Sequence, residues 1–398
     1  MGKYKIVSLP GDGIGKAVLD EAIRVLDAAG FEADYVVGDI GWEFWRSEGN
    51  PLPQRTLDLI AEHKIGLFGA ITSKPKDEAF NALSPELQEK GLVYASPIVG
   101  LRQHFGLDIC LRPCKTYKGN PLNFIRRGPN DSIQEPEVDV AIFRQNTEGL
   151  YGGVEWSNPP KQVYDALMTH PKFKQNFGDA PVEEVSVSTR IFTKKYTERI
   201  LRAAFEHAKK YGYKSVTVCE KPNVIRETSG MMYKMAQEIQ KADFPEIELW
   251  NTNIDAQMMW LTKNPENYGV IVAGNMFGDI VSDGFAGLIG GLGFACSAQY
   301  NPETGIGVFE PTHGSAPKYA DYPVSIVNPI AMVESACMML DFIDEQEIAK
   351  NIRKAVAEVV LDGKVKTYDM AKMTGKADVV EKGAASTMKM ANAIIAKL

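Results

Sequence analysis

Two carboxylates four residues apart stand in an otherwise small and apolar stretch, GNMFGDIVSDG, at residues 274–284. If this stretch is helical, Asp279 and Asp283 lie one turn apart on the same face. Like charges at this spacing cost a helix a few tenths of a kcal/mol, so a positive group should lie between them. Carboxylates without His or Cys nearby suit Mg²⁺ or Mn²⁺ better than zinc. The alternative, helix-start acids favoured by the macrodipole, explains Asp279 but not Asp283. The spacing therefore predicts a site for a hard divalent cation.

Three arginines could bind an anion. Arg102 and Arg112 belong to SPIVGLRQHFGLDICLRP, which also holds Ser96, and Arg144 belongs to FRQNTEGLYGG, which also holds Tyr151. Arg112 and Arg144 adjoin strand-like apolar runs, where an unpaired guanidinium would be costly. A guanidinium at a strand end suits bidentate binding of a carboxylate. One such arginine is more often a surface residue, but three favour a small polyanionic substrate.

A lysine follows another strand-like run. Lys221 comes directly after KSVTVCE, at the carboxyl end where α/β proteins place their chemistry. A lysine there loses its proton readily if it is desolvated or lies near a metal. Taken alone, Lys221 reads as a solvated loop residue, and Asp255, in NTNIDAQMM, is equally ordinary.

The elements that must position these side chains alternate in type. KYKIVSLP, IGLFGAI, KSVTVCE and GVIVAGN read as strands, whereas residues 16–29 and 192–211 read as helices and residues 329–398 as mostly helical. This alternation predicts an α/β fold with largely parallel strands. Residues 152–188 are rich in Pro, Asn and Lys and predict a loop or small subdomain that leaves the core. The turn GDGIG lacks the third glycine of a Rossmann fingerprint, since Lys16 stands there.

Composition excludes several classes of protein. The 398 residues are 44% hydrophobic and 24% charged, which is typical of a folded globular chain. The net charge of −7 disfavours nucleic acid as a partner. No apolar run reaches the length of a membrane span. The odd number of cysteines, five, favours reduced thiols. We therefore expect a cytoplasmic protein without a membrane partner.

Taken together, these stretches resemble the isocitrate/3-isopropylmalate dehydrogenase family, the metal-dependent β-decarboxylating dehydrogenases. The resemblance runs through PGDGIG, SxxxxxRxxxxxxxxxR, FRxNTEGLYxG, KPNV, GNMFGDIVSD and EPTHGSAPKYA. It implies a large discontinuous α/β domain on the cofactor side, residues 1–107 and 290–398. Residues 108–148 and 194–289 would form a smaller α/β domain, and residues 149–193 resemble the clasp that dimerises family members. The family binds its dinucleotide without a Rossmann fold, so GDGIG need not match that fingerprint.

The resemblance also implies roles for the candidate site residues. The substrate would be a small 2-hydroxy polycarboxylate, bound by Ser96, Arg102, Arg112 and Arg144. Mg²⁺ or Mn²⁺ would bind Asp279 and Asp283, together with Asp255 of the partner subunit. Lys221, contributed across a homodimer with shared sites, would help to remove the hydroxyl proton. Tyr151 would reprotonate the enolate that remains after CO₂ leaves.

For the cofactor, the resemblance implies NADP⁺. NAD-dependent members usually carry an acidic residue at the position of Lys318, whereas Lys318 and Tyr319 could bind the 2′-phosphate. Tyr368 and Lys372 resemble a second phosphate-binding pair. The alternative is that these are ordinary surface lysines and tyrosines. The remaining implied cofactor residues are Thr72, His313, Gly314 and Asn328.

The substrate is predicted to be isocitrate, since isocitrate-specific members resemble this chain at Ser96. Those members usually carry Asn two residues later, and here Ile98 takes that place. Homoisocitrate or another 3-substituted malate, with NAD⁺ as a possible cofactor, is therefore the alternative. A regulatory subunit that keeps the fold without the chemistry is the non-enzymatic alternative. The presence of Tyr151, Lys221 and all three aspartates favours a catalyst.

Overall fold

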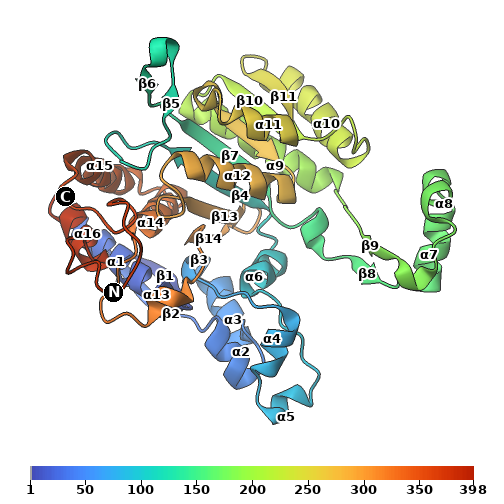
Figure 1. Ribbon diagram of the computed structural model, residues 1–398, viewed down its shortest axis with the longest axis horizontal. Coiled ribbons are helices and arrows are strands. Elements are labelled where there is room, and N and C mark those ends of the chain that lie inside the picture. The colour runs from blue at the N-terminus through green and yellow to red at the C-terminus, as the bar shows by residue number, and fades with distance from the viewer. Residues whose placement is uncertain (1) are drawn as a thin grey trace.

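A mixed ten-stranded sheet runs through the body of the protein, whose computed structural model describes residues 2–398 (Figure 1). In spatial order the strands are β11 (Glu248–Asn253), β10 (Ser215–Glu220), β12 (Val270–Ala273), β7 (Asp139–Gln145), β4 (Ile109–Lys115), β13 (Cys296–Asn301), β14 (Ile306–Pro311), β3 (Ile65–Ala70), β1 (Tyr4–Gly11) and β2 (Ala33–Val37). Two short hairpins lie outside the sheet, β5 (Arg126–Arg127) with β6 (Ile133–Gln134) and β8 (Glu155–Ser157) with β9 (Ser186–Ser188). The predicted α/β class is confirmed.

The two ends of the sheet differ from its centre. Pairing is parallel from β11 to β7 and from β14 to β2, as predicted. In the centre, β4 runs antiparallel to β7 and β13, and β13 runs antiparallel to β14. The sheet is thus largely parallel, as predicted, and its antiparallel centre was not foreseen. The turn 302–305 explains one of these pairs, because a connection this short can join only antiparallel strands. Gly305 closes that turn with a φ of 68°.

Helices cover the sheet and account for the predicted helical patterns. The helix expected at residues 192–211 is α9, and the C-terminal helical region contains α14, α15 and α16. No helix within residues 2–398 is long and apolar enough to cross a membrane. The helices of the body are α1 (Gly15–Ala28), α2 (Trp42–Glu48), α3 (Gln54–His63), α4 (Lys76–Asn81), α5 (Pro85–Gln88), α6 (Pro97–Phe105), α9 (Lys194–Tyr211), α10 (Thr228–Asp243), α11 (Ile254–Trp260), α12 (Asn275–Leu288), α13 (Pro317–Ala320), α14 (Ile330–Phe342), α15 (Gln346–Asp362) and α16 (Thr387–Ile395).

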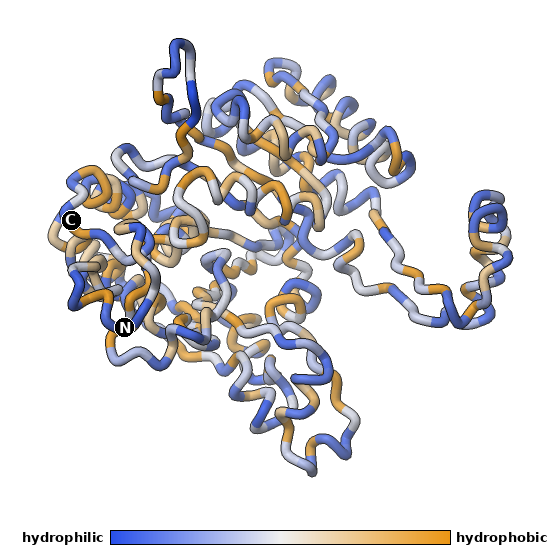
Figure 2. The backbone as a smooth tube through the Cα atoms, viewed as in Figure 1, coloured by the Kyte–Doolittle hydropathy of each residue, from blue (hydrophilic) through white to orange (hydrophobic). Residues whose placement is uncertain are grey.

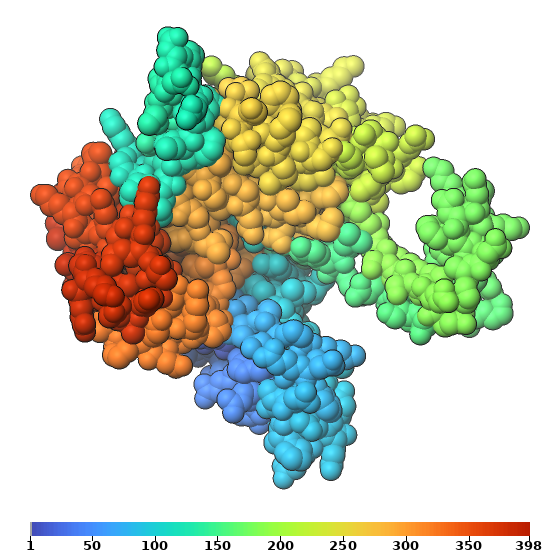
Figure 3. Space-filling model, in the orientation of Figure 1, coloured from blue at the N-terminus to red at the C-terminus, as the bar shows by residue number. Residues whose placement is uncertain are grey.

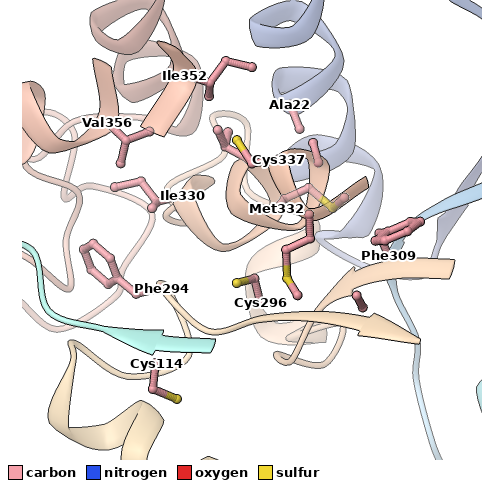
Figure 4. Packing of buried hydrophobic residues seen from close by; sticks show 14 of the residues in the cluster. Ala22, Cys114, Phe294, Cys296, Phe309, Ile330, Met332, Cys337, Ile352 and Val356 are labelled. Carbon is pink, nitrogen blue, oxygen red and sulfur yellow. The ribbon is translucent and has the colours of Figure 1, made fainter. Parts of the chain in front are cut away.

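The main core forms around α14, which is mostly apolar and is buried from Ile330 to Leu340. It packs between the sheet and helices α1 and α15, as Figure 4 shows for Met332, Cys337 and Phe309. Hydrophobic residues follow the central strands, while the outer turns of the surrounding helices are largely hydrophilic (Figure 2). All five cysteines are free and buried in the structure.

Residues 149–193 form an arm that stands away from the body (Figures 1 and 3). The β8–β9 hairpin is its stalk, and its tip consists of α7 (Lys161–Met168) and α8 (Pro171–Phe177). Neither tip helix has a buried residue, so the arm lacks a core of its own. The arm matches the predicted excursion from the core. Its role as a dimerising clasp, like the predicted domain boundaries across the continuous sheet, stays a prediction.

Candidate active site

The central strands present alternate side chains to two clefts on opposite faces of the sheet. On β4, Arg112 lines one cleft, whereas Leu111 and Pro113 line the other. On β14, Glu310 lines the same cleft as Arg112, and Phe309 lines the other. We call the first the front cleft. It has a volume of about 510 Å³ and is lined by Ile71, Thr72, Ser73, Lys74, Ile98, Arg102, Arg112, Glu310, Pro311, Thr312, His313, Gly314, Ser315, Ala316 and Pro317.

A group of charged side chains adjoins the front cleft. Arg112 Nη1 donates to Asp279 Oδ1 at 3.0 Å and to Asp283 Oδ1 at 3.3 Å. Arg144 Nη1 also donates to Asp279, and its Nε donates to Asn275 Oδ1 at 3.0 Å. The positive group that the aspartate spacing required is therefore present in the chain itself. We call Arg112, Arg144, Tyr151, Asp279 and Asp283 the arginine–aspartate cluster.

Helix α12 brings the two aspartates to the arginines because it packs closely on β7. A Cβ added at Gly278 would lie 2.7 Å from Cβ of Arg144, which is closer than carbon atoms can approach. Only glycine at this position lets the helix carry Asp279 so near to the strand. The predicted helix and the shared face of the two aspartates are thus present, one turn apart on α12.

Arg144 is the most buried residue of the arginine–aspartate cluster. The Arg144 side chain is 2% exposed, and burial, together with the nearby Arg112, lowers its pKa to about 10. It therefore remains protonated at neutral pH. Tyr151 donates its hydroxyl to Asp279 Oδ2 at 3.1 Å, and its ring lies 5.5 Å from the Arg144 guanidinium. A proton-carrying hydroxyl thus adjoins the Asp279 carboxylate, beside the Arg144 guanidinium.

The donor set fits a hard divalent cation. Mg²⁺ is usually held by one or two carboxylates, with substrate oxygens and water completing its octahedron. Asp279 and Asp283 supply two such carboxylates, and the Asp283 side chain is 59% exposed. No three His, Cys, Asp or Glu side chains within residues 2–398 converge on one metal position.

Lys221 and Asp255 come together, but away from the cluster. Lys221 Nζ forms an ion pair with Asp255 Oδ1, and this hydrogen bond lowers the pKa of Asp255. Within the described chain, neither side chain hydrogen-bonds with the arginine–aspartate cluster. The Asp255 side chain is 68% exposed. The structure therefore pairs the predicted catalytic lysine with the predicted third metal ligand at an accessible position.

Arg102 lies in the front cleft with two partners that the sequence analysis did not identify. Its Nε donates to Gln299 Oε1 at 2.5 Å, and its Nη2 lies 3.4 Å from Glu310 Oε1. Ser96 caps the start of α6 by position, yet its side chain makes no capping hydrogen bond. Ile98, on the first turn of α6, is 8% exposed and lines the cleft with Arg102.

The GDGIG turn supports the wall of the front cleft. The Asp12 carboxylate accepts from the backbone N–H of Thr72 at 2.8 Å and of Trp42 at 2.7 Å. The Thr72 hydroxyl lies 2.5 Å from that of Ser315. Beyond it, His313 Nδ1 lies 3.1 Å from the Gly314 carbonyl, while its buried Nε2 has no partner within residues 2–398. Burial lowers the pKa of His313.

The residues predicted to bind the adenosine phosphate also gather. The Lys318 ammonium lies 4.7 Å from the centre of the Tyr319 ring, and that ring packs edge-on against Tyr368 at 5.5 Å. Lys372 lies in the same turn as Tyr368 and has a φ of 55°. Nearby, Asn328 Nδ2 donates to Asp369 Oδ2 at 3.2 Å.

Comparison with known proteins places this geometry in a family. Residues 5–394 match the isocitrate/isopropylmalate dehydrogenase family. The chain belongs to this family. One relative is protein DlpA of Legionella pneumophila, which is 38% identical over 98% of this chain. The chain spans 58% of the length of DlpA. The 3-isopropylmalate dehydrogenase of Archaeoglobus fulgidus is 36% identical over 99% of both chains. The crystal structure of isocitrate dehydrogenase from Methylococcus capsulatus superposes with a TM-score of 0.80, 33% identity and 99% coverage of both chains.

Members of the isocitrate/isopropylmalate dehydrogenase family are decarboxylating dehydrogenases that act on small hydroxy acids. They use a divalent metal and NAD or NADP. Other relatives are named homoisocitrate dehydrogenase and NADP isocitrate dehydrogenase. The predicted family and reaction class are therefore confirmed, while the particular substrate and dinucleotide are not fixed by the relatives' names.

Sequence reasoning missed several side chains that hold the arginines of the candidate site in place. Gln299 and Glu310 engage Arg102, and Asn275 engages Arg144. Two of these were within reach of a closer reading, because Asn275 belongs to GNMFGD and Glu310 opens EPTHG. Gln299 sits in SAQYN, which carries no local signal of its own.

Proposed function

We propose that the protein catalyses the metal-dependent oxidative decarboxylation of isocitrate to 2-oxoglutarate, with NADP⁺ as the hydride acceptor. The observation that carries this proposal is the arginine–aspartate cluster. Two guanidinium groups and a tyrosine hydroxyl converge on Asp279 beside a cleft that holds a third arginine. This arrangement suits a substrate with several carboxylates and one hydroxyl that is oxidised beside a metal.

In this proposal the arginines bind and orient the substrate. Arg112 and Arg102 both line the front cleft, and Arg144 lies behind Asp279. The side chains of Asp279, Asp283, Gln299 and Glu310 hold these guanidinium groups in place. Substrate carboxylates would exchange with some of those partners. The arginines are then already desolvated and oriented, so the cost of ordering them is met before binding.

When bound at Asp279 and Asp283, the divalent cation would acidify the C2 hydroxyl and polarise the ketone that forms from it. The hydroxyl proton would pass to a base, and a bound dinucleotide would accept the hydride from C2. The bond from C3 to its carboxylate then breaks, CO₂ leaves, and the electron pair remains as an enolate. A proton added at C3 completes 2-oxoglutarate.

Tyr151 is placed to supply that last proton. Its hydroxyl points at Asp279 Oδ2, in the cluster where the reacting carbons would lie. Lys221, delivered by the partner subunit, would help to take the hydroxyl proton. Its ammonium already pairs with Asp255, so the two residues could enter a neighbouring site together.

A homodimer with shared sites would complete the cluster. Around Lys221 and Asp255 the surface carries large exposed apolar side chains, including Val224 at 68%, Met259 at 49% and Trp260 at 42%. On α12, Ile280 is 42% exposed one residue after Asp279. A second copy of the chain that covered these side chains would bring its own Lys221 and Asp255 toward the aspartates of α12.

NADP⁺ is favoured by the gathering of Lys318, Tyr319 and Tyr368. A lysine with two phenolic hydroxyls provides a charge and hydrogen-bond donors for a 2′-phosphate. Lys372, in the same turn as Tyr368, could add a second charge. It replaces the bidentate fork of an arginine with a single ammonium, which weakens geometric recognition. His313 and Asn328 would then face the adenine.

Ile98 favours a second candidate substrate. Its apolar side chain lines the front cleft beside Arg102, where isocitrate-specific members of the family usually carry Asn. Loss of a polar partner for the substrate costs about 1–3 kcal/mol. Homoisocitrate, whose side chain is one methylene longer, or another 3-substituted malate would depend less on that contact.

The experiment that tests the proposal measures kcat/KM for isocitrate, homoisocitrate and 3-isopropylmalate, each with Mg²⁺ and NADP⁺ and again with NAD⁺. We expect isocitrate with NADP⁺ to rank first. Isocitrate in last place would overturn the substrate assignment and leave the family's chemistry intact. Absence of turnover with all three, by a protein that binds metal, would overturn the catalytic assignment in favour of a regulatory subunit.

A further inference from the structure

A fully buried carboxylate lies directly before Lys221. Glu220, the last residue of β10, is 0% exposed and belongs to no part of the proposed chemistry. An isolated buried charge is costly, so its partners reveal what it holds. Its Oε1 accepts from the backbone N–H of Gly274 at 2.7 Å. Its Oε2 accepts from Arg190 Nη2 at 2.8 Å and from the Ser229 hydroxyl.

Each of these donors comes from a different element. Gly274 immediately precedes α12, the helix that carries Asp279 and Asp283. Ser229 lies in the first turn of α10, and its hydroxyl accepts from the backbone N–H of Lys221 at 3.4 Å. Glu220 thus links the start of the aspartate helix to the backbone of the lysine that would serve the partner's site.

The third donor connects the arm. Arg190 lies where the arm rejoins the body, next to a bridge that pairs Gly149 with Ile191. Its guanidinium lies 4.4 Å from the centre of the Phe192 ring and 5.1 Å from that of Phe277, which is on α12. One arginine therefore contacts the arm, the buried carboxylate and the aspartate helix.

The packing around this point leaves little room for adjustment. A Cβ at Gly274 would lie 2.5 Å from the Phe192 ring and 2.6 Å from Glu220 Oε1. Only glycine at position 274 therefore fits between Phe192 at the arm's base and Glu220, and both neighbours lie close to the start of α12. The geometry makes the position of α12 depend on both neighbours.

We propose that Glu220, with Arg190, is a positioning device that sets the aspartate helix relative to Lys221 and to the base of the arm. The proposal rests on the proposed function, since it assigns Asp279 and Asp283 to a metal. Glu220 touches no reacting atom. It acts through the start of α12 on its own site and through the backbone of Lys221 on the partner's site.

A matched control comes from another buried carboxylate. Glu334, in α14, is 7% exposed and accepts from Arg353 Nε at 3.2 Å and from the Tyr117 hydroxyl. It lines the opposite face of the sheet and contacts neither α12 nor Lys221 through a hydrogen bond. Glu220→Gln and Glu334→Gln make the same chemical change in similar surroundings, so a difference between them reports on position in the fold.

The test uses the full-length protein and Mn²⁺ alone, with free Mn²⁺ counted by electron paramagnetic resonance. We expect Glu220→Gln to weaken Mn²⁺ binding about tenfold and to lower kcat, with KM for the dinucleotide unchanged. Arg190→Gln, which leaves the Gly274 and Ser229 bonds in place, should weaken it about threefold. Glu334→Gln should lose thermal stability and keep the Mn²⁺ affinity of the wild type.

The proposal is overturned if Glu220→Gln and Arg190→Gln fold and bind Mn²⁺ with the affinity of the wild type. It is also overturned if neither variant folds, because Glu220 would then serve the fold alone. If the wild-type protein binds no Mn²⁺, the proposed function fails instead. The positioning role is then judged by amide exchange in the metal-free proteins. Faster exchange at residues 221–230 and 274–283 in Glu220→Gln, but not in Glu334→Gln, would support it, and equal exchange would overturn it.

Discussion

The two faces of the central strands differ in the side chains that they present. The front face carries the arginines, the aspartates of α12 and Glu310, with most charges held in ion pairs. The back face lines a larger cleft of about 1450 Å³, which we call the back cleft. Its aromatic lining residues are Tyr117, Phe143, His207, Tyr211, Tyr213, Tyr268, Phe294, Tyr300, Phe309 and Phe342.

The difference follows from strand geometry. Successive side chains of a strand point to opposite faces, so Phe143 and Arg144 of β7 are neighbours in sequence but serve different surroundings. Phe143 packs at 1% exposure with the His207 ring 5.2 Å away. Arg144 is equally buried but lies against Asp279 and Asn275. Substitutions on the front should therefore change activity, and substitutions on the back should change stability.

The largest effect is expected at Arg144. Arg144→Ala removes two charge-assisted hydrogen bonds, each worth about 1.5–3 kcal/mol, and leaves Asp279 without one of its partners. We expect kcat/KM to fall by about 10³–10⁴-fold, measured with saturating Mg²⁺ and NADP⁺. Far-ultraviolet circular dichroism should show an intact fold. Retention of activity within tenfold would break the assignment of the front face to chemistry.

The adjacent residue provides the opposite test. Phe143→Ala should lower the free energy of unfolding by about 3 kcal/mol, at the low end for a buried phenylalanine, because the neighbouring back cleft lets side chains relax. Urea unfolding measures the loss. Turnover per folded molecule should change less than threefold. A large fall in kcat with unchanged stability would show that the back face takes part in catalysis.

A histidine on the back face should also make the stability of the fold depend on pH. Burial, with a contribution from Lys210, lowers the pKa of His207 from 6.5 to about 4, while Asp139 opposes the shift. Between these values the unfolded chain binds a proton that the folded chain does not, so stability is lost as the pH falls below about 6.5. The loss from this group at pH 5 is about 2 kcal/mol.

His207→Gln removes that proton uptake. Urea unfolding at pH 5 and pH 8 should show a smaller loss of stability on acidification in the variant than in the wild type. Burial raises the pKa of Asp108 to about 6, which gives an opposite slope over part of this range, but it does so in both proteins. Equal slopes in the two proteins would show that His207 takes up its proton in the folded state.

How much of the difference between the two faces the sequence predicts depends on how far apart along the chain the interacting residues lie. The strands, α12 and the shared face of Asp279 and Asp283 were predictable, because hydropathy and spacing are local. The partners of Glu220 were not, since Arg190 and Gly274 lie 30 and 54 residues away along the chain. The antiparallel centre was missed because parallel pairing was inferred from alternation alone. The back cleft was missed because single aromatic residues on several elements form no motif.

The smallest effect is expected at the rim of the front face, where Lys318 lies outside the arginine–aspartate cluster. Lys318 is exposed, and its ammonium lies 4.7 Å from the centre of the Tyr319 ring. That ring packs against Tyr368. Lys318→Asp replaces the charge proposed to bind the 2′-phosphate with one that repels it. One charge-assisted hydrogen bond is worth about 1.5–3 kcal/mol, so kcat/KM for NADP⁺ should fall about tenfold or more.

The same variant should spare NAD⁺, because a carboxylate accepts hydrogen bonds from the free 2′- and 3′-hydroxyls. The ratio of kcat/KM for the two dinucleotides is therefore the measurement, with isocitrate and Mg²⁺ held saturating. Lys74, which lines the front cleft, pairs with Glu78, and Lys74→Asp is the matched control. An equal change of the ratio in both variants would show a general effect of charge on the cleft. If the wild-type protein prefers NAD⁺, or if Lys318→Asp leaves the ratio unchanged, Lys318 does not bind the 2′-phosphate. The front face would then select its ligands through the arginines alone.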